Sequence, residues 1–423
     1  MNDISNLLLK ESNDNFSNIL NKKTTKIKKF KRKFKKKEKS KTIINKNNND
    51  GIKKNKKIIK VRNPGVDLLR IISMSGIILC HILGHGGAYR RFPSYKKLNY
   101  FEGFLGWHIN GFGLISGVVG YKTHKYSNLL YLWCCVFSYL VAIHFYYEKY
   151  KLIHVYENIY EEIFPVIFGK YWYFTKYFGM YLFLPAINKG IEYLTKSELK
   201  ITVLSFYGII SLWQMYKNKN FDAFNIGNGG SIPWFIVLYL TGAYIGKYNV
   251  TYNGIKKFIY CLICLIVYIS VSLINYQLLF NYNPYNIKRY YLRKITIFLK
   301  IFTEQRYYAV PRVLQSISLC LFLIQIKYNK YISKIICFLG PLTFGIYLIH
   351  DNNLVRRYKI QTLYNKLPNS LSFNSVIKYT FITYGKIYII CSGIDYMRHV
   401  LFTIFRIKKI CIFLEKIVFK ILG

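Results

Sequence analysis

Four charged or imidazole side chains lie within one apolar stretch of the sequence, NPGVDLLRIISMSGIILCHILGHGG, at residues 63–87. They are Asp67, Arg70, His81 and His85. The stretch predicts a membrane-spanning helix, in which such side chains are costly and are kept where they face a protein interior or a watery cavity. At about 100° per residue, Arg70, His81 and His85 lie about 60° or less from Asp67. One helix face therefore holds all four, if the helix persists through Gly84.

These residue types permit a structural and a functional interpretation. In the structural one, Asp67 and Arg70 form an internal ion pair, and His81 and His85 only cap the end of the helix. In the functional one, the four side chains face a watery cavity and act on a ligand there. The shared helix face favours the functional interpretation.

The remaining sequence indicates that many further helices position this face. Of the 423 residues, 52% are hydrophobic and only 18 are acidic. A run of about 20 apolar residues can cross a bilayer, and the sequence has about ten such runs. We therefore predict an all-α, polytopic integral membrane protein with about ten transmembrane helices. They are expected near residues 66–83, 101–120, 128–147, 164–187, 199–215, 231–247, 256–276, 309–326, 332–350 and 374–392. The more charged stretch 288–308 is expected to form a lumenal or interfacial helix.

The distribution of charge predicts the domain boundaries. Residues 1–62 hold 21 Lys and Arg against five acidic residues. High charge and few large apolar side chains predict a disordered, polybasic tail at residues 1–60. Lys and Arg recur among apolar residues at 396–423, which predicts a basic amphipathic helix at the membrane surface. The membrane domain then spans residues 61–395.

The same charges predict how the chain crosses the membrane. Cytosolic loops carry an excess of Lys and Arg, and both termini are strongly basic. With an even number of spans we expect a multi-pass protein with both termini in the cytosol. The net charge of +44 is explained in this way, so no nucleic-acid partner is expected. One loop disagrees: its four basic residues would lie outside, where the rule disfavours them unless they act on a ligand. They are Arg90, Arg91, Lys96 and Lys97.

Several motifs resemble those of one known family. Arg70-x10-His81 resembles the arginine-to-histidine motif in the first span of acyltransferase-3 membrane proteins, and the opening segment is similar to theirs nearly throughout. Three further stretches agree in order: KYWYFTKYFGMYLFLPAIN at 170–188, SIPWFIVLYLTGAYIGKY at 231–248 and PLTFGIYLIHDNNLVR at 341–356. The similarity covers roughly residues 61–405. The second span departs from the family pattern, because Trp107 and His108 stand in unexpected places.

The resemblance implies transfer of an acyl group from acyl-coenzyme A to a hydroxyl group. It makes His81 the candidate general base and Arg70 the candidate for binding coenzyme A phosphates. The two lie eleven residues apart, about 16 Å along a helix, a distance comparable with an extended pantetheine arm. Asp67 is expected to orient Arg70 or complete the phosphate site, and His85 to assist His81 or line the acceptor entrance. These are the candidate site residues on the first span.

Two further residues are candidates on the acceptor side. His350, with Asp351 beside it, either shapes that side or caps its helix. Trp172 either packs at the membrane interface or stacks on a sugar. No metal is expected, because Cys261 and Cys264, the only pair with metal-like spacing, lack a second pair and a nearby histidine. No cofactor is expected to stay bound.

The predicted protein is thus a membrane acyltransferase whose partners are lipid, acyl-coenzyme A and a carbohydrate or glycolipid acceptor. Acetyl-coenzyme A is the expected co-substrate, and another acyl-coenzyme A is the alternative. A different class of protein also fits buried charges in a membrane: a transporter or flippase of glycolipids or polyols. No internal repeat of the kind found in many transporters is evident.

Overall fold

A computed structural model describes residues 62–422, except 123, 151–158, 217–221, 223, 249–251, 282–305 and 366. The predicted tail at residues 1–60 lies outside this part of the chain. Nearly all of the predicted helix at 288–308 does so as well. The account below concerns the unit that begins at Arg62.

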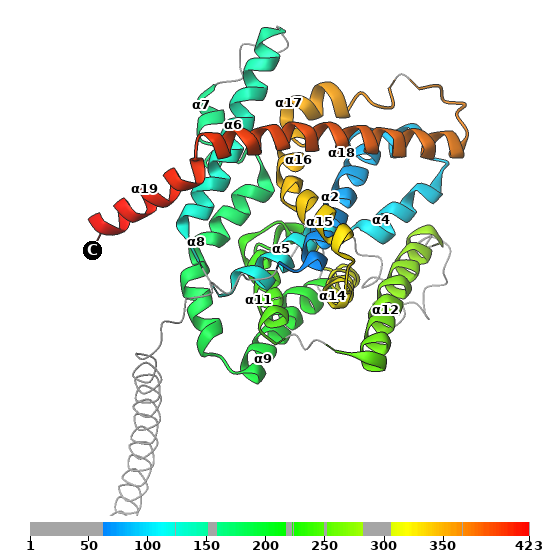
Figure 1. The fold of residues 1–423 in the computed structure, drawn as a ribbon. Helices are drawn as coiled ribbons and strands as arrows, with labels where there is room; N and C mark the ends of the chain where they lie inside the picture. Colours follow the sequence, from blue (N-terminus) through cyan, green and yellow to red (C-terminus); the bar gives the residue numbers. More distant parts are fainter. Residues whose placement is uncertain are drawn as a thin grey trace, which may run out of the picture. The chain divides into compact units, whose positions relative to one another are not determined.

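Helices make up the fold, and no strand occurs in the described residues. The prediction of an all-α protein is therefore confirmed. The longer helices are α2 (Pro64–Leu83), α5 (His108–Gly120), α6 (Tyr126–Lys149), α8 (Trp172–Tyr193), α9 (Lys196–Phe206), α11 (Ile232–Tyr248), α12 (Gly254–Asn281), α14 (Val310–Gln325), α15 (Lys330–Leu339), α18 (Phe373–Ile404) and α19 (Ile407–Ile421) (Figure 1). Shorter ones include α3 (Ala88–Arg91), α4 (Asn99–Leu105), α16 (Thr343–His350) and α17 (Asn353–Val355).

Within the described residues, five helical segments are long and apolar enough to cross a membrane. They are Pro64–Arg91, Tyr126–Lys149, Gly254–Gln277, Lys330–His350 and Phe373–Ile404, and Val310–Gln325 is a shorter apolar helix. The other predicted spans correspond to helices that are shorter, broken or less apolar. The total of about ten spans thus stays a prediction.

Two predicted spans are interrupted. The span expected at 101–120 consists of α4 and α5, with a break at Gly106 and Trp107. The span expected at 164–187 becomes helical only at Trp172. The preceding segment contains Pro165 and Gly169, and the left-handed backbone of Gly169 (φ 61°) is incompatible with a continuing helix.

Helix α2 is the central element of this unit. Its start is stabilised by Asn63, whose side chain accepts a hydrogen bond from the Gly65 N–H at 2.8 Å, and by Pro64 in the first turn. It contacts α4, α5, α14, α15, α16 and α18. Figure 1 shows α2 in blue among the yellow and orange helices from the second half of the chain. Polar groups on α2 are therefore enclosed by protein.

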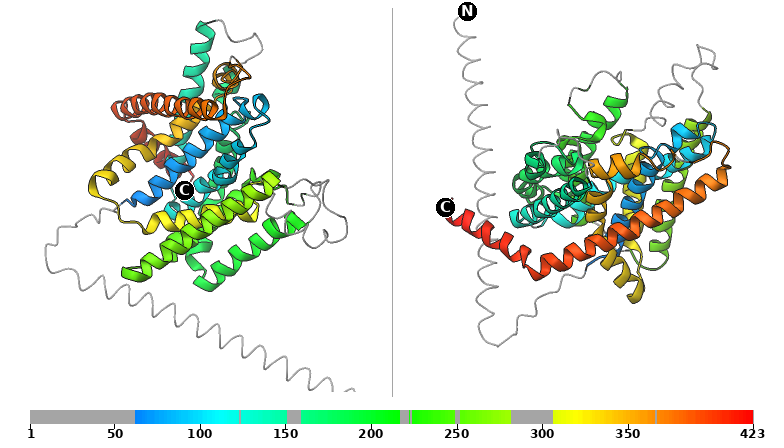
Figure 2. Two further views of the ribbon diagram at one scale, coloured as in Figure 1. Left: turned by 90° about the vertical axis from the view of Figure 1, so that its right-hand side faces the viewer. Right: turned by 90° about the horizontal axis from the view of Figure 1, so that it is seen from above.

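The domain boundary predicted at residue 395 stays a prediction, and this residue lies within a helix. Helix α18 continues through that position to Ile404, and α19 begins at Ile407 after a bend (Figure 2). Arg406 produces the bend with a left-handed backbone (φ 52°). Helix α19 contacts α6 and buries Cys411, so its apolar face is partly covered by protein.

Candidate active site

The first turns of α2 carry a buried carboxylate, Asp67, that is paired with two arginines. Arg70 donates from Nη1 to Oδ1 at 2.5 Å, and Arg62 donates from Nη2 to the same oxygen at 2.6 Å. A lone buried charge is costly, so the two arginines offset the carboxylate, which in turn holds Arg70 in place. The predicted pair of Asp67 with Arg70 is present. Arg62, which the sequence analysis did not single out, is its third member.

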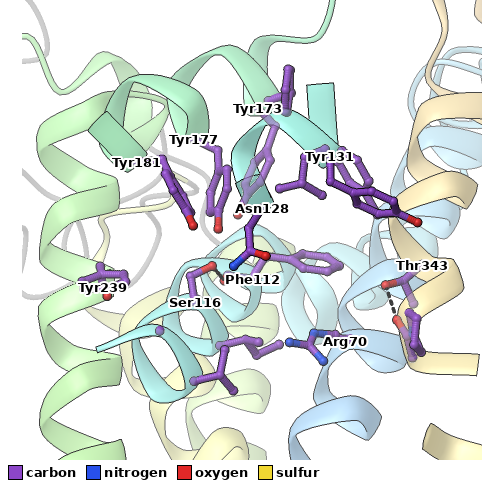
Figure 3. A pocket seen from close by; sticks show the side chains of 18 of the residues that line it. Arg70, Phe112, Ser116, Asn128, Tyr131, Tyr173, Tyr177, Tyr181, Tyr239 and Thr343 are labelled. Atoms are coloured by element: carbon purple, nitrogen blue, oxygen red, sulfur yellow. Dashed lines mark hydrogen bonds between the residues drawn. The ribbon is translucent and has the colours of Figure 1, made fainter. Parts of the chain in front are cut away.

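Arg70 and Arg62 line a cavity of about 560 Å³ (Figure 3). Its size is that of a small-molecule or cofactor site. Lys408 from α19 adds a third cation. The wall is largely aromatic and comes from α5, α6, α8, α11 and α16, through Phe112, Tyr131, Tyr173, Phe174, Tyr177, Tyr181, Tyr239 and Phe344. Such a cavity suits a ligand that combines phosphate groups with a less polar part.

His81 lies in the last turn of α2, away from Arg70. The helix ends at Leu83, as the span predicted at 66–83 implies, so the condition that it persist through Gly84 is not met and His85 lies in the following turn. Gly86 permits this turn, because a Cβ there would lie 2.1 Å from the Ile82 carbonyl oxygen. The rings of His81 and His85 are still adjacent, with centroids 4.8 Å apart.

A carboxylate from another helix faces His81. Asp351, directly after α16, has its Oδ1 3.5 Å from His81 Nδ1. Arg356 Nη1 lies 3.4 Å from the same oxygen. Burial raises the pKa of Asp351 to about 6, although Arg356 opposes this shift. A carboxylate beside an imidazole orients the ring and stabilises its protonated form. The sequence places Asp351 beside His350, and its contact with His81 arises only in the folded protein.

His350 also lies beside His81, with ring centroids 5.2 Å apart. Its Nδ1 is 2.7 Å from the Ile346 carbonyl oxygen, so this nitrogen carries a proton and donates it to the last turn of α16. Its Nε2 is buried and has no hydrogen-bond partner. His350 therefore both caps its helix and contributes to the cluster around His81.

A small cavity of about 50 Å³ adjoins this cluster. His81, Asp351, Trp172 and His108 are among its lining residues. Phe112, Tyr173 and Phe344 line both this cavity and the larger one beside Arg70. The two cavities are therefore neighbours, and Trp172 lines the small one; its role on the acceptor side stays a prediction. His108 was given no role in the sequence analysis, because its spacing alone did not connect it to His81.

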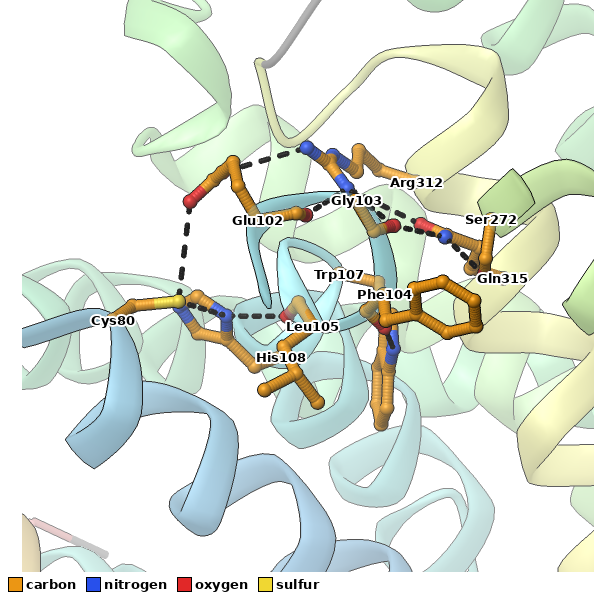
Figure 4. Close-up of polar contacts among 10 residues, drawn as sticks. All are labelled: Cys80, Glu102, Gly103, Phe104, Leu105, Trp107, His108, Ser272, Arg312 and Gln315. Carbon is orange, nitrogen blue, oxygen red and sulfur yellow. Dashed lines mark hydrogen bonds and ion pairs between the residues drawn. The ribbon is translucent and has the colours of Figure 1, made fainter. Parts of the chain in front are cut away.

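A buried polar network supports the wall near His108 (Figure 4). Arg312 of α14 is fully buried, donates to the Glu102 carbonyl oxygen at 2.7 Å and lies 3.4 Å from the Glu102 carboxylate. Gly106 leaves room for this guanidinium, since a Cβ there would lie 2.3 Å from Arg312 Cζ. His108 Nδ1 is 2.6 Å from the Leu105 carbonyl oxygen. The Glu102 carboxylate is thus paired with a guanidinium from another helix.

Three side chains of the cluster could also hold a metal ion. His81, His85 and Asp351 offer ligand atoms that all lie within 4.8 Å of one another. Two imidazoles and a carboxylate are a donor set that divalent transition metals accept. Arg356 already contacts the carboxylate, and its positive charge opposes cation binding there. The absence of a resident metal stays a prediction.

Comparison with known proteins identifies the family. The family model described as an acyltransferase domain, that of acyltransferase-3, matches residues 63–391. The chain belongs to the acyltransferase-3 family. The match includes α2, with Arg70 and His81, and ends within α18. No curated protein and no solved structure matched the chain. With its apolar helices, this acyltransferase-3 protein is an integral membrane acyltransferase, which favours the enzyme over the transporter or flippase.

Proposed function

We propose that this protein transfers an acetyl group from acetyl-coenzyme A to a hydroxyl group of a carbohydrate or glycolipid. One observation carries the proposal: the cavity beside Arg70 and the small cavity beside His81 share three lining residues. Eleven residues separate Arg70 from His81 on one helix, about 16 Å. An extended donor can therefore bind its phosphates near Arg70 and present its thioester near His81.

The donor end of the site uses charge and aromatic surface. Arg70 and Arg62 bind the phosphates of coenzyme A, with Asp67 as a positioning residue between them. Lys408 adds charge at the same cavity. Donor binding here does not require a metal, because the arginines supply the positive charge.

In the proposed chemical step, His81 accepts a proton from the acceptor and later returns it to the leaving coenzyme A sulfur. Asp351 faces Nδ1 of His81, so Nε2 is the nitrogen that takes the proton from the acceptor hydroxyl. The hydroxyl oxygen then forms a bond to the thioester carbonyl carbon. As the carbon–sulfur bond breaks, the coenzyme A sulfur takes the proton back from His81. The ionised Asp351 stabilises the imidazolium between these two transfers.

The small cavity supports a short acyl group. A group the size of a water molecule needs roughly 10–15 Å³ of cavity volume. The small cavity of about 50 Å³ therefore holds about four groups of this size. An acetyl group, with two carbons and one oxygen, fits this space, whereas a long acyl chain exceeds it. The large side chains of Phe112, Tyr173 and Phe344 set this limit.

The acceptor is expected to approach from the His85 side of His81. His85 lies in the turn after α2 and is exposed, and it lines a separate polar pocket. His350 and Trp172 lie next to His81 and are candidates for acceptor contacts. Donor and acceptor would then meet at His81 from opposite directions along α2.

Separate duties for His81 and Arg70 allow a direct test. Purified protein is supplied with radiolabelled acetyl-coenzyme A and a panel of glycans, and labelled product is counted. His81→Ala should lower the transfer rate about 10²-fold to 10⁴-fold while coenzyme A still binds. Arg70→Lys keeps the charge but loses the bidentate fork, so it should chiefly weaken coenzyme A binding. Both variants are checked for normal folding, because Asp67 depends on its arginines. Wild-type transfer by a folded His81→Ala protein would refute the assignment of the base.

A further inference from the structure

A polar pocket of about 460 Å³ lies beside the turn that follows α2. It is lined by Gly84, His85, Gly87, Arg90, Arg357, Gln361, Thr362 and Asn365. Two arginines from distant parts of the chain thus face one space, and its lining includes no carboxylate. Both arginines are exposed to solvent. A pocket with this composition has a positive potential and hydrogen-bonding groups around it.

The two chain segments that form the pocket are strongly basic. Residues 84–98 and residues 352–371 each contain four Lys or Arg and no Asp or Glu. In the predicted topology this end of α2 lies outside the cytosol, where such an excess is disfavoured. The membrane topology therefore does not explain the positive charge at this end of α2. Binding of an anionic ligand does explain it.

We infer that this pocket binds an anionic group of the acceptor, so that the acceptor is an acidic carbohydrate bearing a carboxylate, sulfate or phosphate. The inference rests on the proposed function. Arg90 and Arg357 would hold the anion through their guanidinium forks. His85 joins the pocket to the reacting centre, since its ring lies 4.8 Å from that of His81. A sugar bound by its acidic group then places a neighbouring hydroxyl near His81.

The phosphates of coenzyme A are also anionic, so coenzyme A is a second candidate ligand for this pocket. The donor site proposed above lies near Arg70, about 16 Å along α2 from His81 and thus away from this pocket. A donor with its phosphates here would leave the cations of the larger cavity without a ligand. The acceptor is therefore the favoured source, and the experiment separates the two.

The test compares acceptors that share their ring hydroxyls but differ in charge at one carbon, and product analysis counts only acetylation of the ring hydroxyls. Purified full-length protein receives acetyl-coenzyme A with methyl glucuronide or methyl glucoside, which share their ring hydroxyls but carry a carboxylate or a hydroxymethyl group. Glucose 6-phosphate and glucose 6-sulfate serve as further anionic probes. At least one anionic probe should be acetylated with a higher kcat/KM than methyl glucoside. Arg90→Gln and Arg357→Gln should each raise KM for that probe about threefold to tenfold.

A matched control variant shows whether loss of one positive charge alone raises KM for the anionic probe. Lys359 is exposed, lies in the same basic segment and does not line the pocket, so Lys359→Gln should leave KM unchanged. KM for acetyl-coenzyme A should stay constant in all three variants. Equal use of charged and neutral acceptors would overturn the inference, and so would a rise in the acetyl-coenzyme A KM of the Arg90 or Arg357 variant.

Failure of the proposed function has a different signature. If the wild-type protein consumes no acetyl-coenzyme A with any acceptor, the acetyl transfer itself is refuted. Binding of the anionic probes is then measured by calorimetry. Binding that Arg90→Gln and Arg357→Gln weaken and Lys359→Gln preserves supports the anion pocket without reference to catalysis. Absence of binding by the wild-type protein refutes the pocket.

Discussion

Asp351 is held between a histidine and an arginine, and this position makes its charge sensitive to pH. Burial raises the pKa of Asp351 to about 6, so the carboxyl group is neutral below that pH and ionised above it. Only the ionised form stabilises a protonated His81. We therefore expect kcat/KM for acyl transfer to fall as the pH drops through about 6, measured as a pH profile with saturating acceptor.

A variant of Arg356 supplies the control for this profile. Arg356 lowers the pKa of Asp351, so Arg356→Gln should move the acidic limb to higher pH. Asp351→Asn cannot titrate, and it should remove this limb while lowering the rate at neutral pH. An acidic limb that stays in place in both variants would show that another group titrates.

At the scale of single residues, the sequence allowed prediction of those groups that share a helix. Asp67, Arg70 and His81 are linked by spacing on α2, and their face could be calculated from the helical repeat. Asp351 lies 270 residues from His81, and their contact depends on how α16 packs against α2. The contact of Arg312 in α14 with Glu102 likewise depends on packing between segments far apart in the sequence.

At the scale of helices, the apolar runs in the sequence predicted the positions of nearly all the longer helices in the described residues. In hydrocarbon a backbone must satisfy its hydrogen bonds internally, so an apolar run of sufficient length has few alternatives to a helix. Breaks within a run depend on tertiary contacts and were not predicted. The break at Gly106 leaves space for a guanidinium from another helix. The end of α2 at Leu83, by contrast, agrees with the span predicted at 66–83.

Close packing of α5 against α11 gives a prediction at this scale. A Cβ added to Gly117 would lie 2.0 Å from the Tyr239 carbonyl oxygen, and one added to Gly242 would lie 2.0 Å from the Leu114 carbonyl oxygen. Small residues let membrane helices approach this closely. Gly117→Ala or Gly242→Ala should force the helices apart and destabilise the fold by about 1–3 kcal/mol. Thermal unfolding in detergent measures the loss.

Gly385 in α18 is the matched control, because no atom lies within 4 Å of a Cβ added there. Gly385→Ala should leave the unfolding temperature unchanged or raise it slightly, since alanine is the better helix former. If Gly117→Ala and Gly385→Ala behave alike, the close contact between α5 and α11 is not what holds the two helices together.

Across the whole molecule, the two ends of α2 differ in the segments that surround them. Arg62 and Arg70 share a cavity with Gly120 at the end of α5 and with Lys408 in α19. Lys408 also donates to Asn128 at the start of α6, at 2.5 Å. The start of α2, the loop between α5 and α6, and the C-terminal helix therefore lie together. His81, by contrast, lies with the turn after α2 and with the segment after α16.

This arrangement leads to a topology that can be tested at four positions. The loop with Lys122, the start of α2 and helix α19 belong with Arg70, whereas Ser94, which is exposed in the loop after α3, belongs with His81. The basic termini favour the cytosol, where acyl-coenzyme A is made available to the Arg70 cavity. Glycosylation tags at either terminus or at Lys122 should stay unmodified, and a tag at Ser94 should be glycosylated.

Retained acyl transfer shows that each tagged protein is folded. A glycosylated tag at one terminus would place the two ends on opposite sides and exclude an even number of spans. Glycosylation at Lys122 with an unmodified tag at Ser94 would invert α2, put the basic loop in the cytosol and remove the topological argument for an anionic acceptor.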